Sequence, residues 1–271
     1  MLPLAEADTE RPRRKLGPQI QARFTRARQL RTIFLRLFAV AFLAVLFAFA
    51  STSAKAQQTY VSRYDVYTGF AVIDSPALGL DEHNGFHVQA GMNPRRWLSF
   101  GGDYSIASGS EMLTTDLLPA DKQATVNAAQ AQYIALGLLP ANYHLAVPTD
   151  AGTQTFAFGP QLAYRHFAKT TLFLRPSLGG LREHAVPHPA DAFQRVIVAG
   201  LAPAGYKTDW TGFYGVGGGA DFTLTPHIGL RAQIDWVYNH PFNDILANGR
   251  WTFRYSVGPS FHFGRNTAAG K

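Results

Sequence analysis

Hydrophobic and polar residues alternate with a period of two near the end of the chain. Between Trp251 and Phe263, every odd position is apolar and no even position carries a large hydrophobic side chain. Such a long run of alternation predicts a β-strand whose two faces meet different surroundings.

Seven further stretches show the same alternation in a less pure form. They lie at 64–72, 86–92, 98–106, 156–165, 172–179, 214–222 and 228–236. Short connections around 94–95, 167–169 and 225–227 alternate with longer ones at 74–83, 108–153, 186–208 and 240–249. This layout is typical of outer-membrane barrels. We therefore predict an all-β fold, a closed antiparallel eight-stranded transmembrane β-barrel, with a short helix between Pro119 and Leu136 in the longest connection.

The polar faces of these stretches predict a lumen rather than a surface in water. They are rich in glycine, which weakens a solvated strand but leaves room for larger neighbours inside a narrow barrel. A soluble barrel or sandwich, the alternative, would turn its apolar face inward. The same polar faces carry four acids and four arginines, which we expect to form a charge-paired lumen network: Asp65, Asp103, Arg165, Arg175, Asp221, Arg231, Asp235 and Arg254. In this network we expect Arg175 to reach Asp103 and Asp221.

The connection at 167–169 predicts a register for its hairpin. If Ala168 centres the turn, paired residues have numbers that sum to 336, which places Gln161 opposite Arg175 in the lumen. Pro160 then lies opposite Pro176 on the outer face. A slip of one residue would move Arg175 into lipid at a cost of about 2–4 kcal/mol near the bilayer midplane. We therefore expect this register to be firmly specified.

Aromatic residues gather near both ends of the expected strands. The set near the short turns is Tyr64, Tyr164, Phe222 and Phe263, and the set near the long connections is Tyr104, Trp210, Tyr238 and Trp251. Two such girdles are expected where a barrel crosses the two membrane interfaces.

The net charge of +7 belongs to the N-terminal segment. Residues 1–56 hold 10 basic and 3 acidic residues, whereas residues 57–271 hold 15 of each sign. The mature chain thus has no basic excess, and we expect no nucleic-acid partner. An arginine-rich stretch ending at Arg36 precedes an uncharged apolar run at 37–50 and the small residues Ala54 and Ala56. This order predicts a signal peptide at 1–56, exported through the Sec pathway and cleaved before Gln57.

The apolar run is also too short for the alternative, an uncleaved inner-membrane anchor, which needs about 20 apolar residues. We accordingly divide the chain into a signal peptide at 1–56, a barrel at 57–264 and a short C-terminal tail at 265–271. Export by this route predicts a protein of the cell outer membrane.

The last strand carries the most specific motif. Over residues 60–264 the chain resembles the OmpA-like family of small outer-membrane β-barrels, and Ser256, Gly258, Phe261 and Phe263 resemble the signal read by the barrel-assembly machinery. The resemblance implies a monomer in the outer membrane of a Gram-negative cell, with outer-membrane lipid and that machinery as partners. No peptidoglycan-binding domain is expected after the barrel.

Candidate chemistry is sparse. The chain has no cysteine, which excludes disulfides and cysteine metal sites. A lipid A deacylase of this size would be expected to present His and Ser with an acidic partner on its lipid-facing side, and the apolar faces hold neither. His87 and His262 fall on polar faces. Four further histidines fall in connections, namely His144, His184, His188 and His240.

His184 and His188 have no strong third ligand nearby, so we expect no metal, no cofactor and no catalytic residue. The favoured function is an integral barrel with a structural or surface-interaction role in the cell envelope, whose exterior-loop ligand is unknown. The alternatives are a narrow porin-like channel and, third, a lipid A-modifying enzyme.

Overall fold

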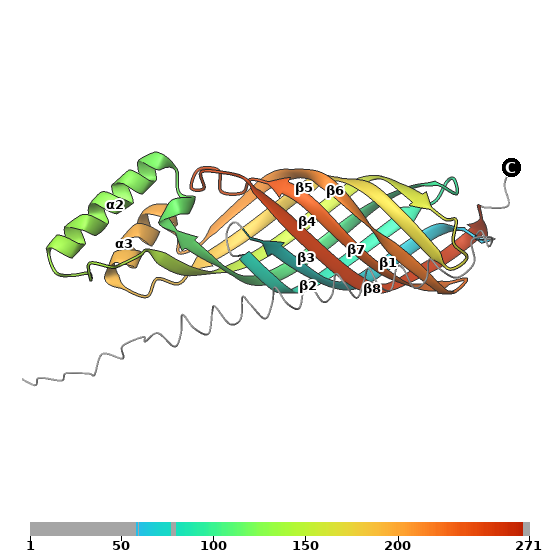
Figure 1. Cartoon of the computed structure of the whole chain (residues 1–271), viewed down its shortest axis with the longest axis horizontal. Coiled ribbons are helices and arrows are strands. Elements are labelled where there is room, and N and C mark those ends of the chain that lie inside the picture. The colour runs from blue at the N-terminus through green and yellow to red at the C-terminus, as the bar shows by residue number, and fades with distance from the viewer. Residues whose placement is uncertain (1–57, 59, 77–79, 268–271) are drawn as a thin grey trace, which may run out of the picture. The chain divides into compact units, whose positions relative to one another are not determined.

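The computed structural model describes residues 58, 60–76 and 80–267. Eight antiparallel strands form a closed barrel in chain order, with the last strand paired to the first (Figure 1). The strands are β1 (Ser62–Ser75), β2 (Leu80–Met92), β3 (Leu98–Thr114), β4 (Ala146–Tyr164), β5 (Thr170–Pro187), β6 (Lys207–Thr225), β7 (Ile228–Asn239) and β8 (Arg250–Asn266). The predicted fold class is confirmed. The expected cleavage residues Ala54 and Ala56 lie outside the described residues.

The strands extend further toward the long connections than predicted. β3 and β4 stay paired as far as Thr114 and Ala146, so the prediction of a loop over 108–153 was wrong. The outward face carries Ser108 and Ser110 here, so the hydrophobic alternation stops although the backbone ladder continues. β5 likewise runs to Pro187, which places His184 in a strand and not in a loop.

The register predicted for the β4–β5 hairpin is confirmed. Leu162 pairs with Leu174, and Ala157 pairs with Gly179. The ladder is interrupted between these two pairs, where Pro160 and Pro176 lie on the exposed outer wall. Proline has no backbone N–H, so a gap in the ladder at this point follows directly from the sequence.

Large apolar side chains cover the outer wall of the barrel. Phe158 is 72% exposed and Leu174 is 55% exposed. The same outward direction holds on every strand, as for Phe70, Phe86, Phe100, Phe158, Leu178, Tyr214, Ile234 and Phe261. We call this surface the apolar band. The outward direction predicted for the apolar faces is therefore confirmed.

Aromatic rings stack at the two edges of the apolar band. Tyr64 stacks on Phe263 near the short turns, with 5.9 Å between ring centroids. Near the long connections, Phe156 stacks with both Tyr104 at 5.9 Å and Trp210 at 5.7 Å. These contacts place aromatic pairs at the positions where two girdles were predicted.

Beyond the apolar band, the long connections form a compact cap with its own apolar core. The cap comprises the strand ends, η1 (Thr115–Leu117), α2 (Ala120–Ala135), α3 (Ala192–Leu201) and the 240–249 connection (Figure 1). Its buried residues include Leu118, Val147, Phe193 and Phe242. None of the helices in the described part of the chain is long and apolar enough to cross a membrane.

The predicted helix at 119–136 is present as α2, whereas α3 was not predicted. Asp191 caps α3 by accepting a hydrogen bond from the Gln194 backbone N–H at 2.8 Å. The Gln194 side chain in turn accepts one from the Ala190 backbone N–H at 2.7 Å. An acidic cap with a glutamine three residues later is a recognisable helix start, so this signal could have been found in the sequence.

Candidate functional site: the charged lumen

Four buried charged residues form a closed ring at the centre of the lumen. Each of the two arginines contacts both aspartates, and the four residues come from β3, β5, β7 and β8. Arg175 lies 2.8 Å from Asp103 and 3.0 Å from Asp235. Arg254 lies 2.9 Å from Asp103 and 2.7 Å from Asp235. We call Asp103, Arg175, Asp235 and Arg254 the central ring.

The central ring is neutral and well supplied with hydrogen bonds. Ser177 donates to Asp235 at 2.9 Å. Arg254 donates to the hydroxyls of Ser105 at 3.1 Å and Thr155 at 3.0 Å. Buried ions persist when charge and hydrogen bonding are satisfied together, and both conditions hold here. One of the two partners predicted for Arg175 was wrong, because Arg175 contacts Asp235 and not Asp221.

A second group of charges lies closer to the short turns. Arg231 contacts Asp221 at 2.7 Å and Asp65 at 3.3 Å. Arg165 was expected in the same network, but it lies just past the end of β4. Its guanidinium donates to the Arg96 carbonyl and, at 3.1 Å, to the Asn93 side-chain oxygen. Among the described residues no carboxylate lies within ion-pair distance of Arg165. β4 passes the level of Asp103 at Ala157 and ends at Tyr164, so Arg165 lies beyond the lumen acids on the short-turn side.

A third group, the neck cluster, lies beyond the apolar band and below the cap. It contains Glu82, Glu111, Glu183 and Arg250. Arg250 pairs with Glu183, and its Nη1 lies 3.9 Å from Glu111. Glu82 accepts a hydrogen bond from Thr153 at 2.8 Å. This cluster was not predicted, because Glu82 and Glu111 were assigned to loops and Glu183 and Arg250 lay outside every predicted strand.

Burial governs the protonation of the neck cluster. Burial, reinforced by the nearby Glu183 carboxylate, raises the pKa of Glu82 to about 8. The same two causes raise the pKa of Glu111 to about 7. Three carboxyl groups share one guanidinium, so they are not all ionised at neutral pH.

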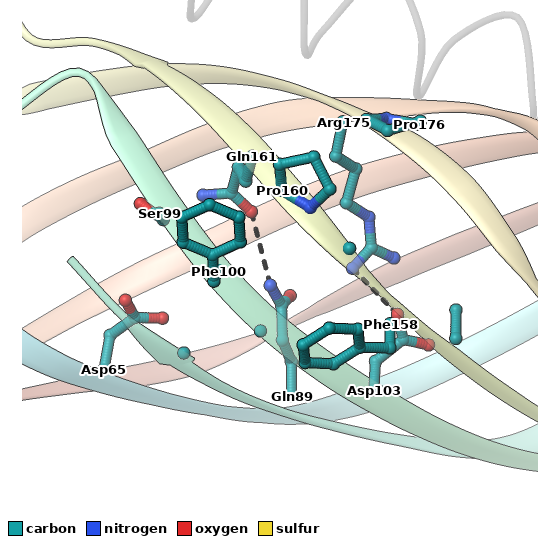
Figure 2. A pocket seen from close by; sticks show the side chains of 14 residues that line it. Asp65, Gln89, Ser99, Phe100, Asp103, Phe158, Pro160, Gln161, Arg175 and Pro176 are labelled. Carbon is teal, nitrogen blue, oxygen red and sulfur yellow. Dashed lines mark hydrogen bonds and ion pairs between the residues drawn. The ribbon is translucent and has the colours of Figure 1, made fainter. Parts of the chain in front are cut away.

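The lumen has little free space at the level of the central ring. Figure 2 shows a cavity lined by Gln89, Asp103, Gln161 and Arg175, whose volume is about 10 Å³. Gln89 donates to Gln161 across the cavity at 3.3 Å. Such a volume holds about one water molecule. The cavity reaches the outer wall beside Pro160, where the ladder is interrupted.

Comparisons with known proteins return structural similarity only. No family model and no curated protein matches the chain. Neisserial surface protein A (NspA) aligns with 14% identity and a TM-score of 0.45, over 74% of this chain and 96% of that one. The attachment invasion locus protein Ail of Yersinia pestis, solved with the heparin analogue sucrose octasulfate, aligns with 11% identity and a TM-score of 0.41, over 74% and 97%. The N-terminal β-barrel domain of Pseudomonas aeruginosa OprF aligns with 10% identity and a TM-score of 0.34, over 74% and 98%.

The residues of the proposed assembly signal alternate across the wall of β8. Ser256 is buried in the lumen beside His87, with 3.0 Å between its hydroxyl and the imidazole. Phe261 and Phe263 are exposed on the apolar band. A methyl group at Gly258 would collide with the backbone carbonyl of Thr68 on β1. β8 continues to Asn266, two residues beyond the expected end of the barrel.

His184 and His188, the two histidines considered as metal ligands, both contact other side chains. His184 lies on the outer wall, 2.7 Å from the Thr208 hydroxyl and beside the Tyr206 ring. His188 contacts Asp150 at 2.8 Å. Within the described ranges, no three His, Cys, Asp or Glu side chains are grouped to hold a metal ion.

Proposed function

We propose that the chain is an integral outer-membrane β-barrel whose lumen is closed by paired charges, with a structural or surface-interaction role in the envelope. The observation that carries the proposal is the central ring. Arg175 and Arg254 reach two aspartates on other strands, and together these four side chains cross the lumen.

The apolar band supports the location in a membrane. Monomeric soluble proteins rarely expose contiguous apolar patches larger than a few hundred Å². Here exposed large hydrophobic residues occur on all eight strands, and stacked aromatic rings lie at both edges of the band. In this orientation the short turns face the periplasm and the cap faces the exterior.

The folded cap supports surface interaction. Its helices and strand ends share an apolar core that includes Leu118 and Phe193, so it presents a structured exterior surface.

The outer wall favours a role without catalysis. His184 is held by a threonine hydroxyl and a tyrosine ring rather than by a carboxylate, the group that usually orients a catalytic histidine.

Planar-bilayer recording of the refolded protein tests the closed lumen. We expect no steady conductance from the wild-type protein and ion leak from the double variant Arg254→Ala with Asp235→Ala, which opens the central ring. The matched control is Arg182→Ala, on the outer wall. Steady wild-type conductance would refute the closed lumen and favour the porin-like alternative.

Lipid A from a deletion strain tests the enzymatic alternative. We expect its acylation pattern to match that of the parent strain. An altered pattern, restored by the wild-type gene and not by a His184→Ala variant, would overturn the non-enzymatic assignment.

A further inference from the structure

Charge is distributed very unevenly along the barrel axis. Outside the lumen, the short-turn end holds six basic residues and, among the described residues, no acidic ones. The six are Arg63, Arg95, Arg96, Arg165, Lys169 and Arg265. The zero net charge of residues 57–271 therefore hides a strongly basic end.

A polar cavity of about 240 Å³ opens at this end. The segment at Gln58 and Tyr60 and the turns at 168–169 and 223–226 form its sides. Arg165 and Arg231 also line it. The volume exceeds that of several water molecules, and it is far larger than that of the cavity of about 10 Å³ beside the central ring.

Two guanidinium groups in this cavity have spare capacity to donate hydrogen bonds. The Nε and Nη2 atoms of Arg231 contact carboxylates, whereas its Nη1 is buried and has no partner. The Arg231 side chain is only 4% exposed. Arg165 donates to the Arg96 carbonyl and to the Asn93 side-chain oxygen, which are both neutral. A buried donor without an acceptor destabilises the fold, so an anion beside Arg231 would offset part of the cost of this uncompensated donor.

The charges that face the cavity leave a positive excess. Asp65 and Asp221 both contact Arg231, and Asn93 joins Asp65 to Arg165. His262 lies 3.4 Å from Asp221. Three cations, Arg165, Lys169 and Arg231, thus face two carboxylates.

Burial also lowers the pKa of Arg165 to about 10, an effect that Asp65 opposes and Arg231 reinforces. This value is far above neutral, so Arg165 remains charged. Its charge is only partly compensated by its surroundings.

We propose that this cavity binds one phosphate group, with Arg165 and Lys169 as its donors and the charge of Arg231 beside it. Arginine favours phosphate because its planar fork offers parallel hydrogen bonds to two oxygens. The phosphate has two possible sources, free inorganic phosphate and the headgroup of a lipid in the adjacent leaflet. The site does not depend on the role proposed for the whole protein.

The experiment uses the barrel refolded in dodecyl maltoside, a detergent without phosphate. One arm adds sodium phosphate against sodium chloride at matched ionic strength. The other arm adds phosphatidic acid against diacylglycerol. The thermal unfolding midpoint is read in both. We expect phosphate in at least one arm to raise the wild-type midpoint in a saturable manner, and Arg165→Gln to weaken the apparent affinity at least tenfold.

Two further variants keep the test decisive. Lys169→Gln changes an exposed residue at the rim of the cavity. Its apparent affinity for phosphate tests the site if Arg165→Gln fails to fold. Arg265→Gln removes an exposed charge at the same end that does not line the cavity, and it should bind like wild type. Stabilisation by phosphatidic acid alone would identify a lipid headgroup as the source. No stabilisation in either arm would refute the proposed site. A loss of affinity in Arg265→Gln equal to that in Arg165→Gln would refute it as well.

Discussion

Gly217 on β6 lies directly across the ladder from Asp235 on β7, and a methyl group at Gly217 would collide with the Asp235 carboxylate. The glycine therefore provides the space that the central ring occupies. This relationship joins two features that the sequence displayed separately, inward glycines and inward charges.

Gly217→Ala should consequently displace Asp235 and weaken the barrel. Overpacking of this kind costs about 1–3 kcal/mol. The midpoint of heat-modifiable gel migration measures the effect. Gly212→Ala on the same strand is the control, because its nearest non-neighbouring atom is 3.9 Å away. Equal effects of the two substitutions would show that strand propensity, and not the ring, explains the glycine.

Leu174 and Arg175 are adjacent in β5 but face lipid and lumen respectively. Leu174→Arg should prevent insertion, at a cost of about 2–4 kcal/mol near the bilayer midplane. Arg175→Leu should still insert, but it should lose about 3–5 kcal/mol because Asp103 and Asp235 lose one of their partners. Insertion yield and unfolding midpoint in lipid vesicles separate the two. Identical behaviour would mean that the direction assigned to this strand is wrong.

Phe263→Ala should lower outer-membrane abundance without impairing refolding in detergent. Phe263 is exposed on the apolar band, and its proposed role lies in assembly rather than in packing of the lumen. Gly258→Asp should also lower abundance, but it should refold poorly because of the collision with Thr68. Quantitative immunoblotting of membranes and refolding yield are compared. Wild-type abundance of the Phe263 variant would remove the support for the assembly signal.

The neck cluster predicts a pH dependence of stability. Burial raises the pKa values of Glu82 to about 8 and of Glu111 to about 7, from an ordinary value of 4.5. The folded protein thus holds protons that the unfolded chain releases. The contribution of these two groups to the free energy of unfolding should be complete below about pH 4.5, fall as the pH rises, and level off above about pH 8. The slope is about 1.4 kcal/mol per pH unit for each proton held.

Glu82→Gln should flatten this decline, because an amide retains the hydrogen bond from Thr153 without ionising. Urea unfolding midpoints between pH 5 and 9 measure the effect. Asp150→Asn provides the control, since the Asp150 side chain is 70% exposed. A wild-type slope in the Glu82 variant would assign the pH dependence to another group.

The exported protein should begin at Gln57. The residues Ala54 and Ala56 place small side chains at the positions that signal peptidase reads. Intact-mass measurement of protein extracted from outer membranes determines the start. A mature species that retains the apolar run at 37–50 would refute the signal peptide.

Local sequence was sufficient for the wall of the barrel. Alternation from Trp251 to Phe263 marks a strand because side chains point to opposite faces at every step. The same rule predicted which face of β5 meets lipid, and the turn at Ala168 set the β4–β5 register. Local sequence was not sufficient where the outward face turns polar, as at Ser108 and Ser110, because the ladder continues there without hydrophobic alternation.

Only the tertiary structure decided which charges meet inside. Asp103 and Arg254 lie on strands that are far apart in the sequence, and their contact depends on strand tilt and stagger around the closed barrel. The alternation placed Arg175 in the lumen but did not specify whether it would contact Asp221 or Asp235. A residue's face is set by its immediate neighbours, whereas its partner across a lumen is set by the closure of all eight strands.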